Sequence, residues 1–381
     1  MKIIIASDSY KGCMSSKEVA TTMEKAIKDV DITINVEKIV TADGGEGFVE
    51  AMVEAAQGII IQQETVNHLL SAKNSYYGVI NEDTAVIDVA SVVGLTEAKV
   101  YELTPEKGSS YGVGVLIAAA INEGYKKIII GLGGSCTNDG GMGLLSALGV
   151  RFYDCLDRVL LPSADNLINV AKVDTSEMLS IKGIEIIVAC DVKNRLLGKN
   201  GATYIFGPQK GISEEMLPVF EKGMVNYSER IKESVGVDLD SFVGGGAAGG
   251  MGSVLFGLLS AKMKMGIELL LETADFLSML EDCDLVITGE GKTDAQTLQG
   301  KAVFGISKAA KEANVPVICI SGSVIDGYQE LYNHGIIGVY SISKEPSTDV
   351  DAIKNARKNL YDFTYSLTKT ILNYYEKGEY K

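Results

Sequence analysis

Short apolar runs that end in polar, glycine-rich loops limit most strongly how this chain can fold. Residues 3–6 form such a run, and the lack of alternation between apolar and polar side chains is typical of a parallel strand buried on both faces. Apolar residues then recur at helical spacing over residues 19–30. The same order of strand, loop and helix repeats over residues 34–56 and returns near residue 284. It predicts parallel α/β units.

The middle of the chain has a different pattern and predicts a second domain. Residues 59–61, 76–80 and 84–89 look like strands joined by short turns, so antiparallel pairing is expected there. We therefore expect a parallel-sheet domain of the Rossmann or flavodoxin kind built from both termini, residues 1–65 and 284–381. Residues 66–283 are expected to form an inserted α/β domain with a mixed sheet, with the active site in the cleft between the two.

Composition and charge argue against several classes of protein. A net charge of −15 predicts no basic surface for nucleic acid or an anionic membrane. No apolar run approaches the length of a membrane span, and the start of the chain turns polar too early for a signal peptide. The six cysteines lack paired spacing, which predicts reduced thiols in a cytoplasmic protein. Whether the chain forms a homo-oligomer stays open.

Residues 131–143 form a glycine-rich loop between a predicted strand and a predicted helix. Six glycines in thirteen positions leave backbone N–H groups unshielded, and Ser135, Thr137 and Asn138 add small polar side chains. Such a loop suits a phosphate or a carboxylate, because the helix start offers N–H donors and a positive dipole end. By itself the loop is equally consistent with a tight turn that needs positive φ at its glycines.

Two further glycine patterns are weaker. Gly244, Gly246 and Gly249 match G-x-G-x-x-G, but the preceding residues make a poor strand, so a dinucleotide-binding fold is not indicated by this loop alone. Gly291-Lys292-Thr293 resembles the end of a Walker A loop, yet the required first glycine is replaced by Val286 inside a predicted strand. A phosphate-binding protein with this sequence is therefore expected to be neither a P-loop enzyme nor a protein kinase.

Acidic residues that follow predicted strands carry the chemical argument. Ligands of open α/β sheets bind at the carboxyl ends of the strands, so these side chains are expected to converge on one crevice. Acids, lysines and glycine amides together suit phosphoryl transfer from a nucleotide. For any single aspartate, capping of the next helix is the simpler explanation. Because six acidic residues occupy such positions, a shared ligand-binding site is favoured. The acids are Asp8, Asp43, Asp139, Asp191, Glu290 and Asp294, and the nearby lysines are Lys11, Lys193, Lys210, Lys292 and Lys301.

Seven segments, taken in order, resemble the successive motifs of the type 1 glycerate kinases. They are residues 8–12, 42–47, 133–141, 189–192, 206–211, 246–252 and 287–291, and they span nearly the whole chain. The resemblance implies a two-domain α/β enzyme that uses ATP and Mg²⁺ to phosphorylate glycerate, with the 2-hydroxyl as the expected acceptor.

Four positions depart from the expected motifs. Ser7 stands in place of proline, Tyr10 in place of phenylalanine, Cys136 in place of alanine and Lys292 in place of arginine. The last matters most, because lysine lacks the bidentate fork of a guanidinium group. If this position grips an anion, its affinity is expected to differ from that of relatives.

The residues and the resemblance together give a set of expected roles. We expect Asp191 beside the attacking hydroxyl and Lys11 near the transferring phosphoryl group. Asp43, Glu46 and Asp139 are candidate ligands of Mg²⁺ or of its water shell. Contacts with substrate or phosphate are expected from Asp8, Ser9, Gly133, Gly134, Ser135, Thr137, Asn138, Lys210, Gly246, Gly249, Glu290 and Lys292. Which anion the 133–141 loop holds stays open at this stage.

Two other functions also stay open on the sequence alone. An NAD-dependent oxidoreductase of a small hydroxy acid would use the loop from Gly244 to Gly249. A non-catalytic sensor of an anionic metabolite would keep the crevice without turnover.

Overall fold

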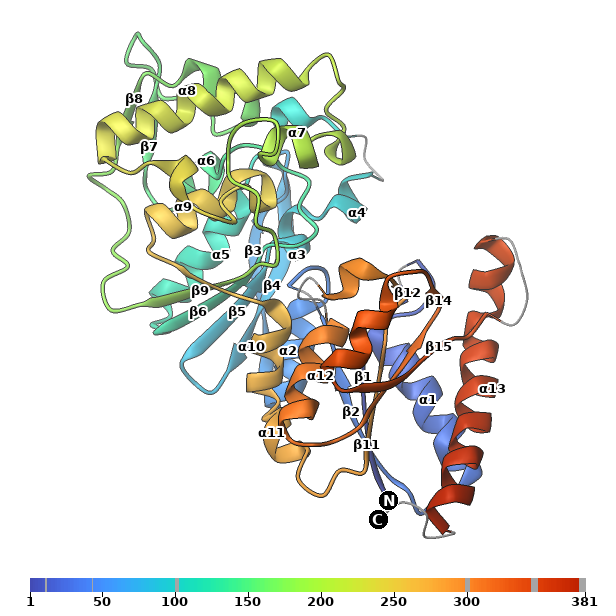
Figure 1. Ribbon diagram of the computed structural model, residues 1–381. Helices are drawn as coiled ribbons and strands as arrows, with labels where there is room; N and C mark the ends of the chain where they lie inside the picture. Colours follow the sequence, from blue (N-terminus) through green and yellow to red (C-terminus); the bar gives the residue numbers. More distant parts are fainter. Residues whose placement is uncertain (11, 43, 100–102, 299–301, 344–348, 377–381) are drawn as a thin grey trace. The chain divides into compact units, whose positions relative to one another are not determined.

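The computed structural model describes residues 1–10, 12–42, 44–99, 103–298, 302–343 and 349–376 (Figure 1). Two compact units are present: Met1–Ala42 together with Ile267–Lys381, and Asp43–Gly266. The first unit is thus built from both ends of the chain. Its boundaries lie at residues 42/43 and 266/267, whereas the sequence pattern places them at 65/66 and 283/284. Residues 43–65 belong to the second unit because the helix at Phe48–Ala56 packs on the strands at Ala72–Ile80 and Thr84–Asp88, and the strand at Ile59–Val66 pairs with Ala72–Ile80.

The first unit contains a five-stranded parallel sheet. Its strand order is β15-β13-β11-β1-β2, which is the 2-1-3-4-5 order of flavodoxin-like folds. The strands are β1 (Lys2–Ser7), β2 (Asn35–Val40), β11 (Leu285–Gly289), β13 (Val317–Ser321) and β15 (Ile336–Ser341). Every residue of β11 and β13 is buried, as their continuous apolar runs predict.

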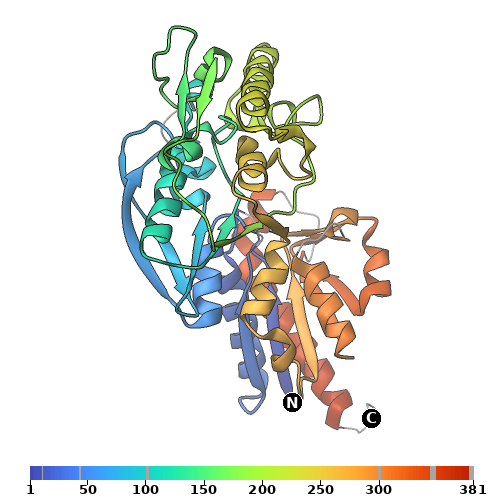
Figure 2. The same cartoon turned by 90° about the vertical axis from the view of Figure 1, so that its left-hand side faces the viewer.

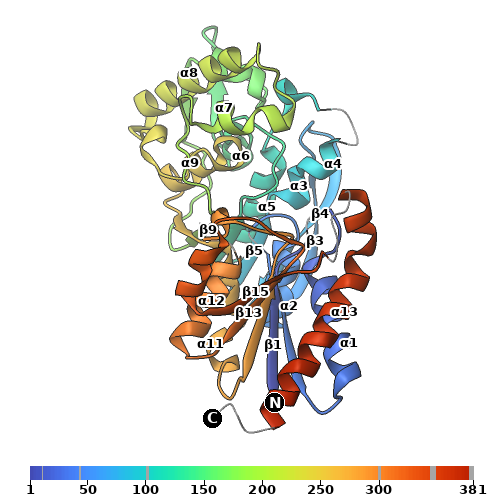
Figure 3. The same ribbon diagram turned by 45° about the vertical axis from the view of Figure 1, so that its right-hand side comes forward.

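Helices cover both faces of this sheet. Figures 1 and 3 show α1 and α13 side by side on one face and α12 on the other. The helices are α1 (Ser16–Val30), α10 (Gly266–Thr273), α11 (Phe276–Met279), α12 (Ala302–Glu312) and α13 (Asp349–Glu376), with short 3₁₀ turns η7 (Ala295–Leu298) and η8 (Tyr328–His334). A small parallel pair, β12 (Lys292–Thr293) and β14 (Ser323–Val324), lies beyond the main strands.

The second unit contains a six-stranded mixed sheet of order β10-β9-β6-β5-β4-β3. Its strands are β3 (Ile59–Val66), β4 (Ala72–Ile80), β5 (Thr84–Asp88), β6 (Lys127–Gly131), β9 (Glu185–Ala189) and β10 (Lys262–Lys264). The β3–β4 and β4–β5 pairs are antiparallel and the remaining pairs are parallel. The predicted α/β class, with one parallel and one mixed sheet, is therefore confirmed.

Helices of the second unit pack on this sheet and on one another. The helix α2 contacts β4 and β5, and α5 contacts α6 and β3. Residues 151–185, which lack a clear sequence pattern, hold the hairpin of β7 (Arg151–Tyr153) and β8 (Lys172–Asp174), and Figures 1 and 2 show α8 beside it. The helices are α2 (Phe48–Ala56), α3 (Ala90–Val93), α4 (Leu95–Ala98), α5 (Tyr111–Asn122), α6 (Met142–Ala147), α7 (Ala202–Phe206), α8 (Leu217–Val235) and α9 (Met251–Gly257). The 3₁₀ turns are η2 (Pro105–Lys107), η3 (Ala164–Asn169), η4 (Pro208–Lys210), η5 (Leu239–Ser241) and η6 (Ala247–Gly250).

Each helix in the described part of the chain is too short or too polar to cross a membrane.

Candidate active site

The predicted site residues form two groups, one at the carboxyl edge of the strands in each unit. Asp8 and Ser9 follow β1, and Glu290 and Lys292 follow β11. The second unit holds Glu46, Gly133, Gly134, Ser135, Thr137, Asn138, Asp139, Asp191, Lys210, Gly246 and Gly249. Lys11 and Asp43 lie outside the described residues.

Neighbouring strands bring the first group together. β1 pairs with β11, and beyond the pair the Asp8 N–H donates to the Gly289 carbonyl at 2.8 Å. The Asp8 carboxylate accepts from the N–H of Ser9 at 2.6 Å, so the turn itself orients this side chain. Lys292 is exposed, with its ammonium 3.7 Å from the Asp294 carboxylate. Asp8 and Glu290 therefore follow adjacent strands at one edge of the sheet.

Hydroxyl groups hold the Glu290 carboxylate. This side chain is only 6% exposed, and its Oε1 accepts from Thr297 Oγ1 at 2.5 Å and from Thr293 Oγ1 at 3.2 Å. The hydroxyl of Ser321, at the end of β13, lies 2.7 Å from Thr293 Oγ1. Sequence patterns do not single out these three hydroxyls for this role, although Thr293 lies in the same loop as Glu290. They fix the direction of a buried carboxylate.

Three loops of the second unit meet at the carboxyl ends of β6 and β9. The Leu132 N–H donates to the Ala189 carbonyl at 3.2 Å, and the Gly133 N–H donates to the Gly44 carbonyl at 2.8 Å. A Cβ added at Gly133 would lie 2.6 Å from Gly45 Cα, so only glycine permits this approach. The glycine-rich loop is thus joined to the 44–47 segment and to the end of β9, two residues before Asp191.

Lys210 lies buried against the glycine-rich loop. Its side chain is 2% exposed, and its ammonium donates to Ser135 Oγ at 3.0 Å and to the Thr137 carbonyl at 2.7 Å. Burial lowers its pKa to about 8, and the nearby Cys136 and Asp139 groups oppose that shift. Within the described ranges, no carboxylate forms an ion pair with this ammonium. A buried cation without a counter-ion suits the capture of an anion.

Two polar atoms of the same loop lack hydrogen-bond partners. The Asn138 amide donates through Nδ2 to Thr203 Oγ1 at 3.1 Å. Its Oδ1 and the Thr137 hydroxyl are buried and have no hydrogen-bond partner in the described structure. Buried polar atoms are normally paired, so these two call for a further partner.

Asp139 anchors the loop to the helix that follows. It is fully buried, and its Oδ2 accepts from the N–H and the hydroxyl of Ser110, each at 2.7 Å, and from the Gly143 N–H at 3.0 Å. Oδ1 lies 3.3 Å from the Gly141 N–H. Burial raises the pKa of this carboxyl, and the hydrogen bonds oppose the rise. Three donors on Oδ2 support an anchoring role for Asp139, and its ligation of Mg²⁺ stays a prediction.

Metal ligation is therefore not preorganised in this part of the chain. The described residues hold no cluster of three or more His, Cys, Asp or Glu side chains suited to a metal ion. Glu46 is exposed and accepts from Thr96 Oγ1 at 3.3 Å. Mg²⁺ in kinases is commonly held by one or two carboxylates together with phosphate oxygens and water. Glu46 fits such a supporting role, because Mg²⁺ held in this way does not need a complete set of protein ligands.

The second glycine-rich loop packs against the first. A Cβ at Gly249 would lie 2.0 Å from the Thr137 carbonyl oxygen, and the Gly140 N–H donates to the Gly249 carbonyl at 2.9 Å. A Cβ at Gly246 would likewise lie 2.3 Å from the Arg195 carbonyl oxygen. The loop follows η5 and not a strand, unlike a dinucleotide-binding turn. Close backbone packing thus explains both glycines, and their contact with substrate stays a prediction.

Asp88 is a buried carboxylate that sequence reasoning misses. It ends β5 beside Gly131 and accepts from the Ser91 N–H at 2.6 Å and the Val49 N–H at 3.4 Å. These donors belong to the first turns of α3 and α2, so one carboxylate caps both helices. Because α2 directly follows the 44–47 segment, Asp88 helps to position that segment. The sequence signal that could have identified Asp88 is its position near the end of the strand predicted at residues 84–89.

Replacing Asp88 with Asn is expected to change how stability depends on pH. Burial raises the pKa of Asp88 from 3.8 to about 6, so the native state binds more protons than the unfolded state between these values. Stability from this group therefore falls as the pH rises through that window, by about 3 kcal/mol in all. As the pH rises from 5 to 7.5, the free energy of unfolding of Asp88→Asn should therefore increase by about 1 kcal/mol relative to that of wild type, as measured by denaturant unfolding. A difference that stays constant with pH would contradict this.

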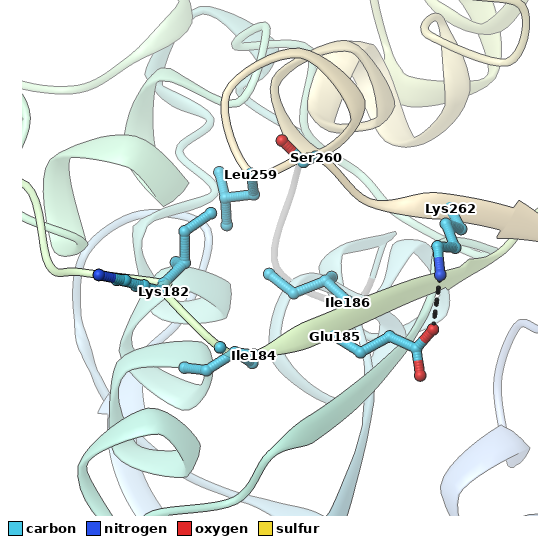
Figure 4. A pocket seen from close by; sticks show the side chains of 9 residues that line it. Lys182, Ile184, Glu185, Ile186, Leu259, Ser260 and Lys262 are labelled. Atoms are coloured by element: carbon cyan, nitrogen blue, oxygen red, sulfur yellow. Dashed lines mark hydrogen bonds and ion pairs between the residues drawn. The ribbon is translucent and has the colours of Figure 1, made fainter.

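A pocket lies at the other end of β9 from Asp191. Its volume is about 550 Å³, and its lining includes Ile184, Ile186, Leu259 and Lys182 (Figure 4). The ion pair of Glu185 and Lys262, 2.8 Å apart, joins β9 and β10 there. Because it adjoins the amino end of β9, this pocket is separate from the predicted site residues.

Comparison with known proteins identifies the chain's relatives. Residues 3–372 match the model of the glycerate kinase family. The chain is 40% identical to a glycerate kinase of Bacillus cereus over 94% of this chain and 95% of the relative. It is 38% identical to glycerate 2-kinase of Escherichia coli over 97% and 98%. A crystal structure from Salmonella typhimurium LT2, described as a candidate glycerate kinase 2, superimposes with a TM-score of 0.83 at 39% identity over 98% of each chain. The chain therefore belongs to the glycerate kinase family.

Proposed function

We propose that this protein transfers the terminal phosphoryl group of ATP to the 2-hydroxyl of glycerate and releases 2-phosphoglycerate and ADP. The observation that carries the proposal is the buried ammonium of Lys210 against a glycine-rich loop, at the strand edge that also leads to Asp191. Relatives over nearly the whole chain are named glycerate kinase, and one is named glycerate 2-kinase.

Positioning and electrostatics account for most of the catalysis expected of such a site. In the proposed mechanism, Asp191 accepts the proton of the attacking hydroxyl, and Lys210 with the loop amides neutralises substrate charge. Lys11 stays our candidate for contact with the transferring phosphoryl group. Mg²⁺, when bound with the nucleotide, would reduce charge repulsion between the phosphates and the hydroxyl, with Glu46 and Asp43 as the proposed supporting carboxylates.

The first unit supplies the other group of polar side chains. We propose that Asp8, Ser9, Glu290 and Lys292 contact the reactants, and that the hydroxyls around Glu290 keep its carboxylate oriented. A cytoplasmic location is proposed as well. All six cysteines are free thiols, as expected in a reducing compartment. The close backbone packing of Gly246 and Gly249 gives no support to the nicotinamide-dependent alternative.

A coupled assay of ADP release tests this function. Purified protein with glycerate, Mg²⁺ and ATP should form ADP in proportion to enzyme, and omission of glycerate should abolish it. Phosphorus NMR of the product should show 2-phosphoglycerate. Absence of ADP above background would refute the kinase proposal, and a 3-phosphate product would refute only the assignment of the acceptor hydroxyl.

A further inference from the structure

We propose that the loop of residues 133–138, together with Lys210, binds the hydroxy acid and not the nucleotide, and that Asn138 Oδ1 accepts a hydrogen bond from a substrate hydroxyl. The inference rests on the proposed function, because it assigns one of the two reactants to this loop. Three features of the second unit point to this ligand: the buried ammonium of Lys210, the orientation of the Asn138 amide, and the two polar atoms that lack partners among the described residues.

The orientation of the amide follows from its neighbours. Asn138 is 1% exposed, and its amide meets Thr203 Oγ1. Burial raises the pKa of Glu221, and hydrogen bonds from the Gly198 N–H and the Thr203 hydroxyl oppose that rise. A hydroxyl whose proton points to a carboxylate can only accept from the amide. Nδ2 therefore faces Thr203, and Oδ1 faces away from it.

The chemistry of Oδ1 selects the ligand. This oxygen has lone pairs and no proton, so its missing partner must be a donor. The phosphate oxygens of a nucleotide at neutral pH are acceptors, and placing one there would set two acceptors against each other. An alcohol supplies the required O–H. The hydroxyl of the preceding residue, Thr137, can donate or accept, which suits the second hydroxyl or the carboxylate of the same small molecule.

Lys210 adds the charge that a hydroxy acid needs. Its ammonium contacts Ser135 and Thr137, on the residues that flank Cys136 in the same loop. Two of its three protons are used in these bonds, and a carboxylate can take the third. Lys210 supplies a cation, Asn138 supplies a hydrogen-bond acceptor, and Thr137 supplies a hydroxyl. Together these groups match a molecule with one carboxylate and two hydroxyls.

A packing defect would produce the same two unpaired atoms without a ligand. Thr364, in α13 of the first unit, also has a buried hydroxyl with no partner among the residues described. It lies outside the predicted site, so Thr364→Val provides a matched control for Thr137→Val. The decisive test must therefore measure which ligand group each atom recognises.

The test is calorimetric binding of three acids without ATP: glycerate, lactate, which lacks the 3-hydroxyl, and 3-hydroxypropionate, which lacks the 2-hydroxyl. Wild type should prefer glycerate over at least one of the two analogues by roughly 10- to 100-fold, since a buried acceptor would lose its donor. Asn138→Ala should lose most of that preference, whereas its affinity for MgATP should change by no more than about twofold. Thr137→Val should weaken glycerate binding, and Thr364→Val should leave it unchanged.

Other outcomes would overturn the assignment. If Asn138→Ala binds MgATP more weakly but keeps the preference among acids, the loop binds the nucleotide and not the hydroxy acid. If Thr137→Val and Thr364→Val change glycerate affinity equally, the unpaired atoms are a packing defect and not part of a ligand site. If Asn138→Ala does not fold, Thr203→Val keeps the amide but removes the acceptor that orients it, and the same loss of preference is expected. A protein that discriminates among the acids yet releases no ADP would refute the kinase proposal alone.

Discussion

Asp191→Asn is expected to lower kcat by about 10²- to 10⁴-fold, the usual contribution of a general base. The substitution keeps the size of the side chain and removes its ability to take the proton of the attacking hydroxyl. Because that interaction forms during phosphoryl transfer and not on nucleotide binding, the affinity for MgATP should change by no more than about twofold. Stopped assays give kcat, and calorimetry gives the dissociation constant of MgATP.

A matched control separates this effect from a general loss of structure. Asp157 is exposed on a surface loop and has φ of 57°, a conformation that asparagine also tolerates. Asp157→Asn makes the same chemical change in the same unit and should leave kcat unaltered. Near-normal turnover in Asp191→Asn would remove Asp191 from the role of base. A large rise in the MgATP dissociation constant would instead make it a nucleotide contact.

The sequence predicts the fold best where the strands are buried on both faces. β1, β6, β9, β11 and β13 are continuous apolar runs, and each can be placed to within a few residues. The limits of the two units were harder to place. β3 joins the second unit because it pairs with β4, and α2 joins it because it packs on β4 and β5. The strand pattern of residues 59–61 and 76–80 does predict antiparallel pairing there, but the packing of α2 leaves no local signal in residues 43–56, whose pattern continues that of the preceding strand and helix.

The candidate site shows the same division between local and distant signals. Asp8, Glu290 and Asp191 could be predicted because each follows a strand. The partners that fix the neighbouring groups could not, since they lie far along the chain: Ser110 is 29 residues from Asp139, and Thr203 is 65 residues from Asn138. A glycine pattern likewise does not reveal that Gly249 packs on Thr137. Such contacts appear only once the loops are placed in space.

Lys210→Met is expected to weaken glycerate binding by about 30- to 1,000-fold, because it removes the charge that faces a buried carboxylate. Methionine keeps much of the length and apolar bulk of the lysine stem. Lys182 offers the matched control: it is exposed at the pocket on the amino side of β9, away from the predicted site. Lys182→Met should bind glycerate as wild type does. Unchanged glycerate affinity in Lys210→Met would place the substrate's counter-charge elsewhere.

The pH dependence of binding gives a sharper test of the same ammonium. The pKa of Lys210 is lowered by burial to about 8, and only the protonated form attracts a carboxylate. Glycerate affinity should therefore be constant below pH 8 and fall by up to about tenfold per pH unit above it. A bound anion favours the ammonium and raises its pKa, so binding at pH 8.5 must take up protons. Calorimetry at that pH, in two buffers that differ in ionisation enthalpy, should show this uptake in wild type and none in Lys210→Met. Equal uptake in both proteins would assign the proton to another group, because methionine cannot bind one.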